Sequence, residues 1–135
     1  MQRDPKQLIF DLIRSDKPFT DLHLCVGEAI RLRMPTGWTT LEMDPLLIQE
    51  VTQFMNVLHT DWDHEIEKGA LNLPFHNEAL IPGWRIRVNA YLSGYRVALS
   101  IRRIPVDPPQ MREIGLPPTT SMMLDTPRGL ILVSG

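Results

Sequence analysis

The segment from Trp84 to Pro105 constrains the fold of this chain more than any other stretch. Apolar and polar residues alternate on both sides of Ser93-Gly94-Tyr95, which is the period-two pattern of half-buried strands. Gly94 permits the positive φ that a tight hairpin turn requires. The segment therefore predicts a two-stranded antiparallel hairpin with one apolar face and one polar face.

Two registers of this hairpin are compatible with the pattern. If Ser93-Gly94 forms the turn, Arg102 lies directly opposite Arg85. If Gly94-Tyr95 forms it, Arg102 lies opposite Arg87. Both registers keep the apolar face intact, so the alternation leaves both open.

In either register two guanidinium groups face each other, and like charges directly opposite destabilise a sheet. No Asp or Glu occurs from Gly83 to Val106 to neutralise them. A bound phosphate or carboxylate would relieve the repulsion, because arginine binds these anions with two parallel hydrogen bonds. Acidic residues elsewhere in the chain, or exposure of the arginines to water, would relieve it equally well. The pattern alone does not decide between these interpretations.

Length and charge restrict the class of protein. A chain of 135 residues is long enough for one hydrophobic core, and its net charge of −2 does not favour nonspecific nucleic-acid binding. Cys25 is the single cysteine, so no internal disulfide can form. No apolar run is long enough to span a membrane, and the N-terminus lacks the apolar core of a signal peptide. We expect a cytoplasmic protein.

Periodicity places the other elements. Helix-start signals at Asp4-Pro5 and Asp44-Pro45 precede apolar residues at helical spacing. The patterns predict helices over 5–15, 45–58 and about 60–69, and strands over 20–26, 29–34, 38–43 and 71–75. Helix, three strands, two helices and further strands together predict an α+β fold with a mainly antiparallel sheet. We expect the helices to cover one face of the sheet and to leave the other face exposed.

The composition changes after Pro105. Eight of the twelve prolines follow residue 73, which indicates a looser, connector-like C-terminal part. Short helical turns are predicted at 111–114 and 119–124. Residues Arg128–Ser134 read as an apolar strand. This strand runs into Gly135 in the way that a strand enters a G-x-x-x-x-G-K-[ST] phosphate-binding loop, although one glycine does not make that motif and the segment also reads as an isolated strand.

No residue set has the spacing of a catalytic or metal site. The four histidines show no metal-ligand spacing, and His59 and His64 are five residues apart, which does not place them on one helical face. Cys25 reads as a small buried residue. The acidic residues between positions 61 and 67 read as a solvated helix face. We therefore predict no catalytic and no metal-binding residues in the chain.

Six segments together carry a family resemblance. They read Thr-Asp-Leu-His-Leu, Gly-Glu-Ala-Ile-Arg, Arg-Ile-Arg-Val-Asn-Ala, Ile-Arg-Arg-Ile-Pro, Ile-Gly-Leu-Pro and Pro-Arg-Gly-Leu-Ile-Leu-Val-Ser-Gly, at Thr20–Leu24, Gly27–Arg31, Arg85–Ala90, Ile101–Pro105, Ile114–Pro117 and Pro127–Gly135. In this order they resemble the N-terminal region of the PilT-like and GspE-like motor ATPases of type IV pili, type II secretion and some conjugation or type IV secretion systems. Two departures are Ala29, where the family has proline, and the lack of an acidic residue near Leu71–Phe75.

This resemblance implies a domain plan. Residues 1–105 correspond to a PAS-like N-terminal domain, 106–126 to a linker, and 127–135 to the first strand of a RecA-like ATPase domain. It implies a homo-hexamer in which the N-terminal domain packs on the ATPase domain of a neighbouring subunit, at the cytoplasmic side of the inner membrane against a platform protein. The chain itself is expected neither to span the membrane nor to bind nucleic acid.

The resemblance also implies a site. In this family, N-terminal-domain arginines reach toward nucleotide phosphates, and the matching positions are Arg87 and Arg102, with Arg85 adjacent. Gly135 corresponds to the start of the phosphate-binding loop. The cofactor would be ATP with Mg²⁺ in the longer protein. This chain lacks the Walker A lysine and the Walker B acid, so we expect it neither to hydrolyse ATP nor to bind it tightly.

Two other classes of function remain open from the residues. A free-standing PAS-like sensor or protein-interaction module would need a ligand pocket or a docking surface. An RNA- or DNA-binding domain would need exposed aromatic residues among the arginines, for which only Tyr91 and Tyr95 are candidates.

Overall fold

The computed structural model describes residues 4–135 of the chain, so the first three residues of the predicted N-terminal domain lie outside it. Ten helices and strands follow one another within the described part. They are α1 (Pro5–Arg14), β1 (Asp21–Cys25), β2 (Arg31–Met34), β3 (Gly37–Thr40), α2 (Ile48–Leu58), α3 (Trp62–Lys68), β4 (Leu71–His76), β5 (Trp84–Ser93), β6 (Arg96–Pro105) and α4 (Thr119–Leu124).

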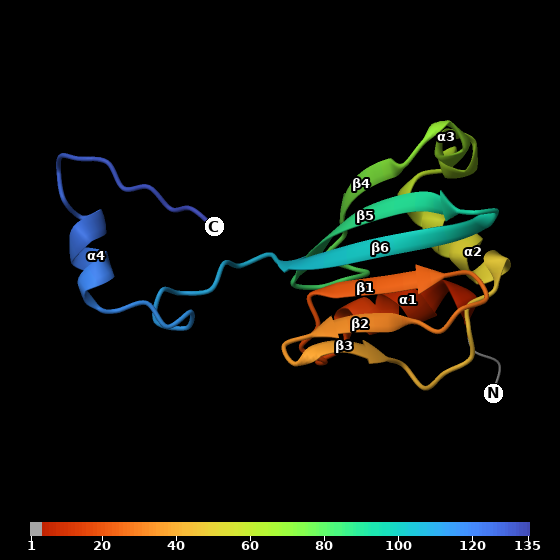
Figure 1. Cartoon of the computed structure of the whole chain (residues 1–135), viewed down its shortest axis with the longest axis horizontal. Coiled ribbons are helices and arrows are strands. Elements are labelled where there is room, and N and C mark those ends of the chain that lie inside the picture. The colour runs from red at the N-terminus through yellow and green to blue at the C-terminus, as the bar shows by residue number, and fades with distance from the viewer. Residues whose placement is uncertain (1–3) are drawn as a thin grey trace.

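The six strands form one sheet in the order β3-β2-β1-β6-β5-β4, and every neighbouring pair is antiparallel (Figure 1). The prediction of an α+β fold with a mainly antiparallel sheet is confirmed. The sheet joins two local meanders, β1-β2-β3 and β4-β5-β6, along the β1–β6 pair. This long-range pairing places the N-terminal strand directly beside the second strand of the arginine hairpin.

The hairpin adopts one of the two registers that its pattern allows. Ser93 pairs with Arg96, so the two-residue turn is Gly94-Tyr95, and Gly94 has φ +65°. A glycine with positive φ at the first turn position is the requirement of a type II′ turn. The same register pairs Arg87 with Arg102.

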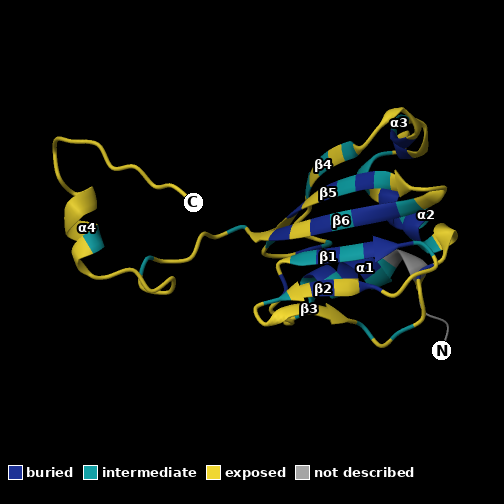
Figure 2. Cartoon of the chain, viewed as in Figure 1, coloured by how far each residue is buried: buried dark blue, intermediate teal, exposed yellow. Residues whose placement is uncertain are grey.

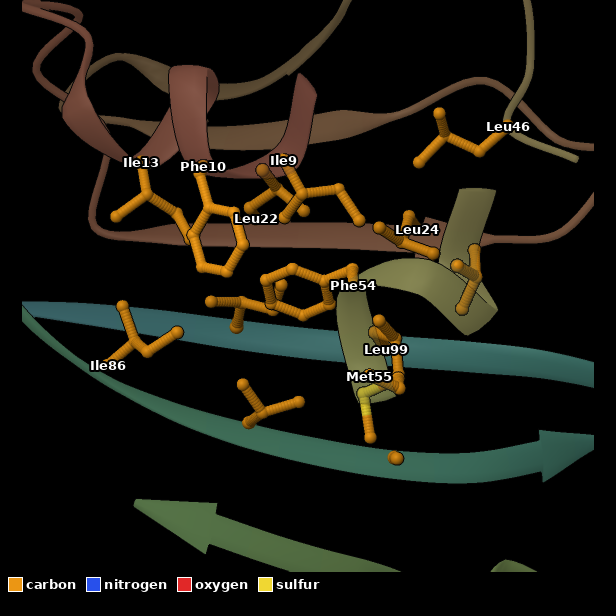
Figure 3. Close-up of a cluster of buried hydrophobic side chains, with 14 of the residues drawn as sticks. Ile9, Phe10, Ile13, Leu22, Leu24, Leu46, Phe54, Met55, Ile86 and Leu99 are labelled. Atoms are coloured by element: carbon orange, nitrogen blue, oxygen red, sulfur yellow. The ribbon is translucent and has the colours of Figure 1, made fainter. Parts of the chain in front are cut away.

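Helices α1 and α2 lie together against one face of the sheet, which is the rear face in Figure 1. The rings of Phe10 on α1 and Phe54 on α2 meet with centroids 5.0 Å apart at the centre of the core (Figure 3). Beneath them lie the inward-pointing residues of the central strands, among them Leu22, Leu99 and Ile86, all of them buried. Burial of these side chains supplies the main stabilising free energy, at about 1.5–3 kcal/mol for each large apolar side chain.

Arg103 is a buried charge within this apolar layer, with only 6% of its surface exposed. Its guanidinium is stacked between the rings of Phe19 and Trp84, at 3.7 and 4.2 Å from their centroids. It donates hydrogen bonds to four backbone carbonyls, that of Ile13 in the last turn of α1 and those of Ser15, Lys17 and Phe19 in the connection from α1 to β1. Arg103 therefore satisfies the last carbonyls of α1 and fixes the connection to the sheet.

The chain beyond Pro105 leaves the sheet and runs away from it as an arm that carries α4 (Figure 1). Almost all of its residues are exposed (Figure 2), including Leu130 and Val133 at 80% and 96%. The predicted strand over Arg128–Ser134 is not formed. The physical reason is that a strand needs a neighbour to pair its backbone groups, and no other strand of the described chain lies beside this segment. The boundaries 1–105, 106–126 and 127–135 stay a prediction.

Candidate functional site

The face of the sheet opposite the helices carries a row of charged residues that crosses four adjacent strands. Strand register places Arg87 of β5 opposite Arg102 of β6, Arg102 opposite Asp21 of β1, and Asp21 opposite Arg33 of β2. Residues directly opposite one another in antiparallel strands point to the same face, with Cβ atoms roughly 4.5–5.5 Å apart. We call these four residues the charged row.

Asp21 neutralises one arginine of the row. The Nε of Arg102 donates to Oδ1 of Asp21 at 2.9 Å, and the hydroxyl of Thr20 donates to Oδ2 at 2.8 Å. The Asp21 side chain is 13% exposed and the Arg102 side chain 62% exposed. Of the explanations for the facing arginines, a carboxylate from elsewhere in the chain is therefore the one that holds for Arg102. Sequence reasoning on the hairpin missed this acid because it lies 81 residues away, on a strand that the hairpin pattern does not include.

Arg87 is different, because its guanidinium has no hydrogen bond or ion pair to any residue that the structure describes. It is exposed and lies directly beside Arg102. The carboxylate of Asp21 therefore neutralises only Arg102 of these two arginines. This leaves about one unit of unneutralised positive charge at the centre of an otherwise slightly acidic chain.

An open hollow of about 240 Å³ lies over this part of the sheet. Its polar lining consists of Asp21, Asn72, Arg87, Asn89, Ser100 and Arg102. The register brings Asn72, Asn89 and Ser100 into a second row beside the charged row. Within the described part of the chain, the Oδ1 atom of Asn89 is buried without a hydrogen-bond partner. The hollow combines two guanidinium groups, a hydroxyl and two amides, whose N–H and O–H groups can donate to an oxyanion, with the carboxylate of Asp21, which repels one.

The other predicted phosphate-contacting positions do not join this hollow. Arg85 points to the same face, two residues before Arg87 on β5, where it pairs in register with His76 and Ile104. It does not line the hollow. Gly135 lies at the end of the C-terminal arm, away from the sheet (Figure 1). Roles of Arg85, Arg87, Arg102 and Gly135 in binding nucleotide stay predictions.

His23 of β1 lies one row away from the charged row, between Ser100 and Arg31. Burial lowers the pKa of His23 below its ordinary value, and the positive charge of Arg31 lowers it further, while Glu28 acts in the opposite direction. His23 is therefore neutral near pH 7, and the arginines dominate the charge of this face.

The remaining titratable residues do not gather into a reactive site. Within residues 4–135, no group of three or more His, Cys, Asp or Glu side chains is arranged to hold a metal ion. Cys25 is buried, as its sequence context predicted. None of the helices among these residues has both the length and the apolar character that a membrane span requires.

Comparison with known proteins relates the chain to motor ATPases. No protein-family model matches it. It is 29% identical over 117 residues to the type IV pilus retraction ATPase PilT of Pseudomonas aeruginosa, and 28% identical over 118 residues to the uncharacterized protein YggR of Escherichia coli K12. Each alignment covers 86% of this chain, but the chain spans only about a third of the length of these relatives, 33% and 34% respectively.

Solved structures show the same fold. The pilus retraction motor PilT with bound ADP superposes with a TM-score of 0.62 at 20% identity, over 83% of this chain and 33% of PilT. The Legionella pneumophila ATPase DotB superposes with a TM-score of 0.65 at 18% identity, over 90% of this chain and 36% of DotB. Sequence and fold together show that the chain is homologous, over about 85% of its length, to the N-terminal region of the pilus retraction ATPase PilT, and its fold is also that of part of the ATPase DotB.

Proposed function

We propose that this chain is the N-terminal regulatory and subunit-docking domain of a hexameric pilus or secretion motor ATPase, and that Arg87 and Arg102 contact nucleotide phosphate at a subunit interface. The observation that carries the proposal is the register of β5 and β6. It places these two arginines side by side over an open hollow, with one carboxylate, that of Asp21, on the far side of Arg102.

The chemistry of the hollow fits a phosphate. Two adjacent guanidinium groups can each donate paired hydrogen bonds to phosphate oxygens, and Ser100 and the two asparagines add neutral donors. An arginine that reaches a transferring phosphoryl group from a neighbouring subunit stabilises the charge that develops on it, and this is worth ~10³ or more in rate. When ATP and Mg²⁺ are bound in the longer protein, the metal ion would be held elsewhere, since the described residues form no acidic cluster suited to it.

The proposal also assigns a role to each of the other parts of the chain. Residues 4–105 of the described structure would form the PAS-like domain. The exposed arm would act as linker over 106–126, and the apolar residues 127–135 would complete the sheet of a RecA-like domain, with Gly135 at the entrance to its phosphate-binding loop. The high exposure of Leu130 and Val133 supports this assignment, because such side chains need a partner surface. The homo-hexamer would act at the cytoplasmic side of the inner membrane, against a platform protein.

The test uses the full-length protein that contains this chain. Arg87→Gln and Arg102→Gln should each lower the ATPase rate by a factor on the order of 10³ while the hexamer persists. Arg96→Gln is the matched control, because Arg96 lies on the same strand but pairs with Glu28 at 2.6 Å near the turn. Its rate should change little. If turnover survives both substitutions, or if Arg102→Gln unfolds the domain, the arginines are structural and the proposal is wrong.

A further inference from the structure

We propose that Asp21 competes with the bound phosphate for Arg102, and that Arg33 receives Asp21 when Arg102 turns to the phosphate. The inference rests on the proposed function, because it assumes an anion over Arg87 and Arg102. It adds a positioning residue, Arg33, and an internal competitor, Asp21, that neither the family resemblance nor the comparisons assign.

The placement of Asp21 carries the argument. Strand β1 lies between β6 and β2, so the carboxylate of Asp21 has an arginine directly opposite on each side, Arg102 and Arg33. In this structure it is bound to Arg102 at 2.9 Å. The guanidinium of Arg33 is exposed and makes no hydrogen bond or ion pair with any described residue. The row therefore contains one occupied and one spare cationic partner for the same carboxylate.

Asp21 cannot lose its arginine without a replacement. Its side chain is only 13% exposed, and the Thr20 hydroxyl satisfies only one of its two oxygens. A largely buried carboxylate without a cation is costly, so it would hold Arg102 strongly and weaken phosphate binding. A second open hollow, lined by Thr20, Asp21, Arg33 and Arg102 among others, gives Arg33 room to approach the carboxylate.

Arg102 can leave because it is the exposed member of the pair. Its side chain is 62% exposed, so its own guanidinium stays hydrated when it leaves, and Arg33 takes its place at the buried carboxylate. A polyphosphate that gains both Arg87 and Arg102 offers more charge-assisted hydrogen bonds than the single contact that it replaces. The row thus has two arrangements: Asp21 on Arg102 with Arg33 free, and Asp21 on Arg33 with Arg102 on the phosphate.

The experiment measures the affinity of the 135-residue chain for inorganic triphosphate by calorimetric titration at low ionic strength. Asp21→Asn should bind about fivefold more tightly than the unmodified chain, since it removes a competitor worth ~1 kcal/mol. Arg33→Gln should weaken binding several-fold, because Asp21 then has no other partner. In a chain that already carries Asp21→Asn, adding Arg33→Gln should no longer weaken triphosphate binding through this exchange.

Two matched controls separate exchange from a general change in charge. Glu28→Gln removes a carboxylate that is also paired with an arginine on the same sheet, but Glu28 does not touch the row. Arg31→Gln removes an arginine from the same strand and face as Arg33, but Arg31 lies opposite His23 instead of Asp21. Glu28→Gln should tighten binding much less than Asp21→Asn. Arg31→Gln should have the same effect with and without Asp21.

The outcomes distinguish this inference from the proposed function. If Arg87→Gln leaves triphosphate affinity unchanged, or if no variant binds at millimolar concentration, the anion site itself is wrong and the inference fails with it. If Arg87→Gln abolishes binding but the effects of Asp21→Asn and Arg33→Gln simply add, the anion site stands and the exchange is wrong. The ¹⁵N-¹H signal of the Arg102 Nε group gives an independent readout. The chemical shift of this signal should change in the Asp21→Asn variant and when triphosphate is added to the unmodified chain. An unchanged chemical shift would show that Arg102 does not exchange partners.

Discussion

Arg102 and Arg103 are consecutive residues of β6 whose guanidinium groups lie on opposite faces of the sheet. Arg102 extends over the open face and pairs with Asp21 of the neighbouring strand. Arg103 enters the core, where two aromatic rings and four backbone carbonyls surround it. One arginine is therefore available to a ligand, and the other holds the N-terminal helix to the sheet.

Replacement of Arg103 should destabilise the domain strongly. Arg103→Met keeps much of the volume but leaves the carbonyls of the α1–β1 turn without donors, and buried acceptors without partners cost about 1–3 kcal/mol each when water cannot reach them. Because water will reach some of them, we expect the free energy of unfolding to fall by roughly 3 kcal/mol, measured by urea denaturation. Arg102→Met is the control and should cost about 1 kcal/mol or less. Equal losses for the two variants would show that Arg103 is not the anchor.

The pH dependence of stability should contain a contribution from His23. Burial and Arg31 lower its pKa in the folded chain below the ordinary value of 6.5 that applies when the chain is unfolded. The unfolded chain then binds more protons in this range, so the stabilising contribution is complete above pH 6.5 and is lost as pH falls below it. His23→Gln should therefore flatten the fall in the free energy of unfolding just below pH 6.5, as measured by urea titrations at several pH values.

A second variant checks the cause of this shift. Arg31→Gln removes the charge but leaves the burial of His23, so the His23 pKa should rise part of the way to 6.5, as followed by NMR titration of the imidazole. A His23 pKa at or above 6.5 in the unmodified chain would contradict the assignment.

The C-terminal arm should be cut by protease before the sheet is. Residues after Val106 are almost all exposed, and Arg112 and Arg128 are trypsin sites within the arm. Limited trypsin digestion followed by mass spectrometry should remove the arm and leave a resistant core ending at the sheet. Protection of both arginines in a chain shown to be monomeric would mean that the arm packs on its own sheet. Protection that appears only with concentration would indicate docking on another copy.

The hairpin and most elements could be predicted from the sequence because their signals are local. The alternation from Trp84 to Pro105 identified two strands and a turn, but not their register, since both registers bury the same apolar face. The pairing of β1 with β6 brings Asp21 to Arg102 across 81 residues, and no local pattern encodes it. The hairpin pattern therefore indicated two residues of the charged row, Arg87 and Arg102, but it did not indicate Asp21, the partner of Arg102.

Arg103 was missed although a signal existed. It follows Leu99 and Ile101 in the inward positions of β6, so the alternation itself places an arginine in the core. A buried arginine requires several acceptors, and its presence there indicates a set of carbonyls to be satisfied. The predicted strand over Arg128–Ser134 failed for the opposite reason. Its residues favour a strand, but strand formation depends on a neighbour that the described chain does not supply.

The two-residue turn at Gly94-Tyr95 has a consequence for how such a domain can change over generations. If the hairpin kept a two-residue turn, one extra residue would shift β6 against β5 and exchange the faces of Arg102 and Arg103, exposing the anchor and burying the charge of Arg102. A variant with that insertion would lose its core before it could acquire a different binding surface. Selection for folding alone is therefore enough to keep positions 87 and 102 side by side, but it does not keep arginine at either position, because both side chains are exposed. Descendants that retain both arginines would be descendants in which the pair itself is under selection.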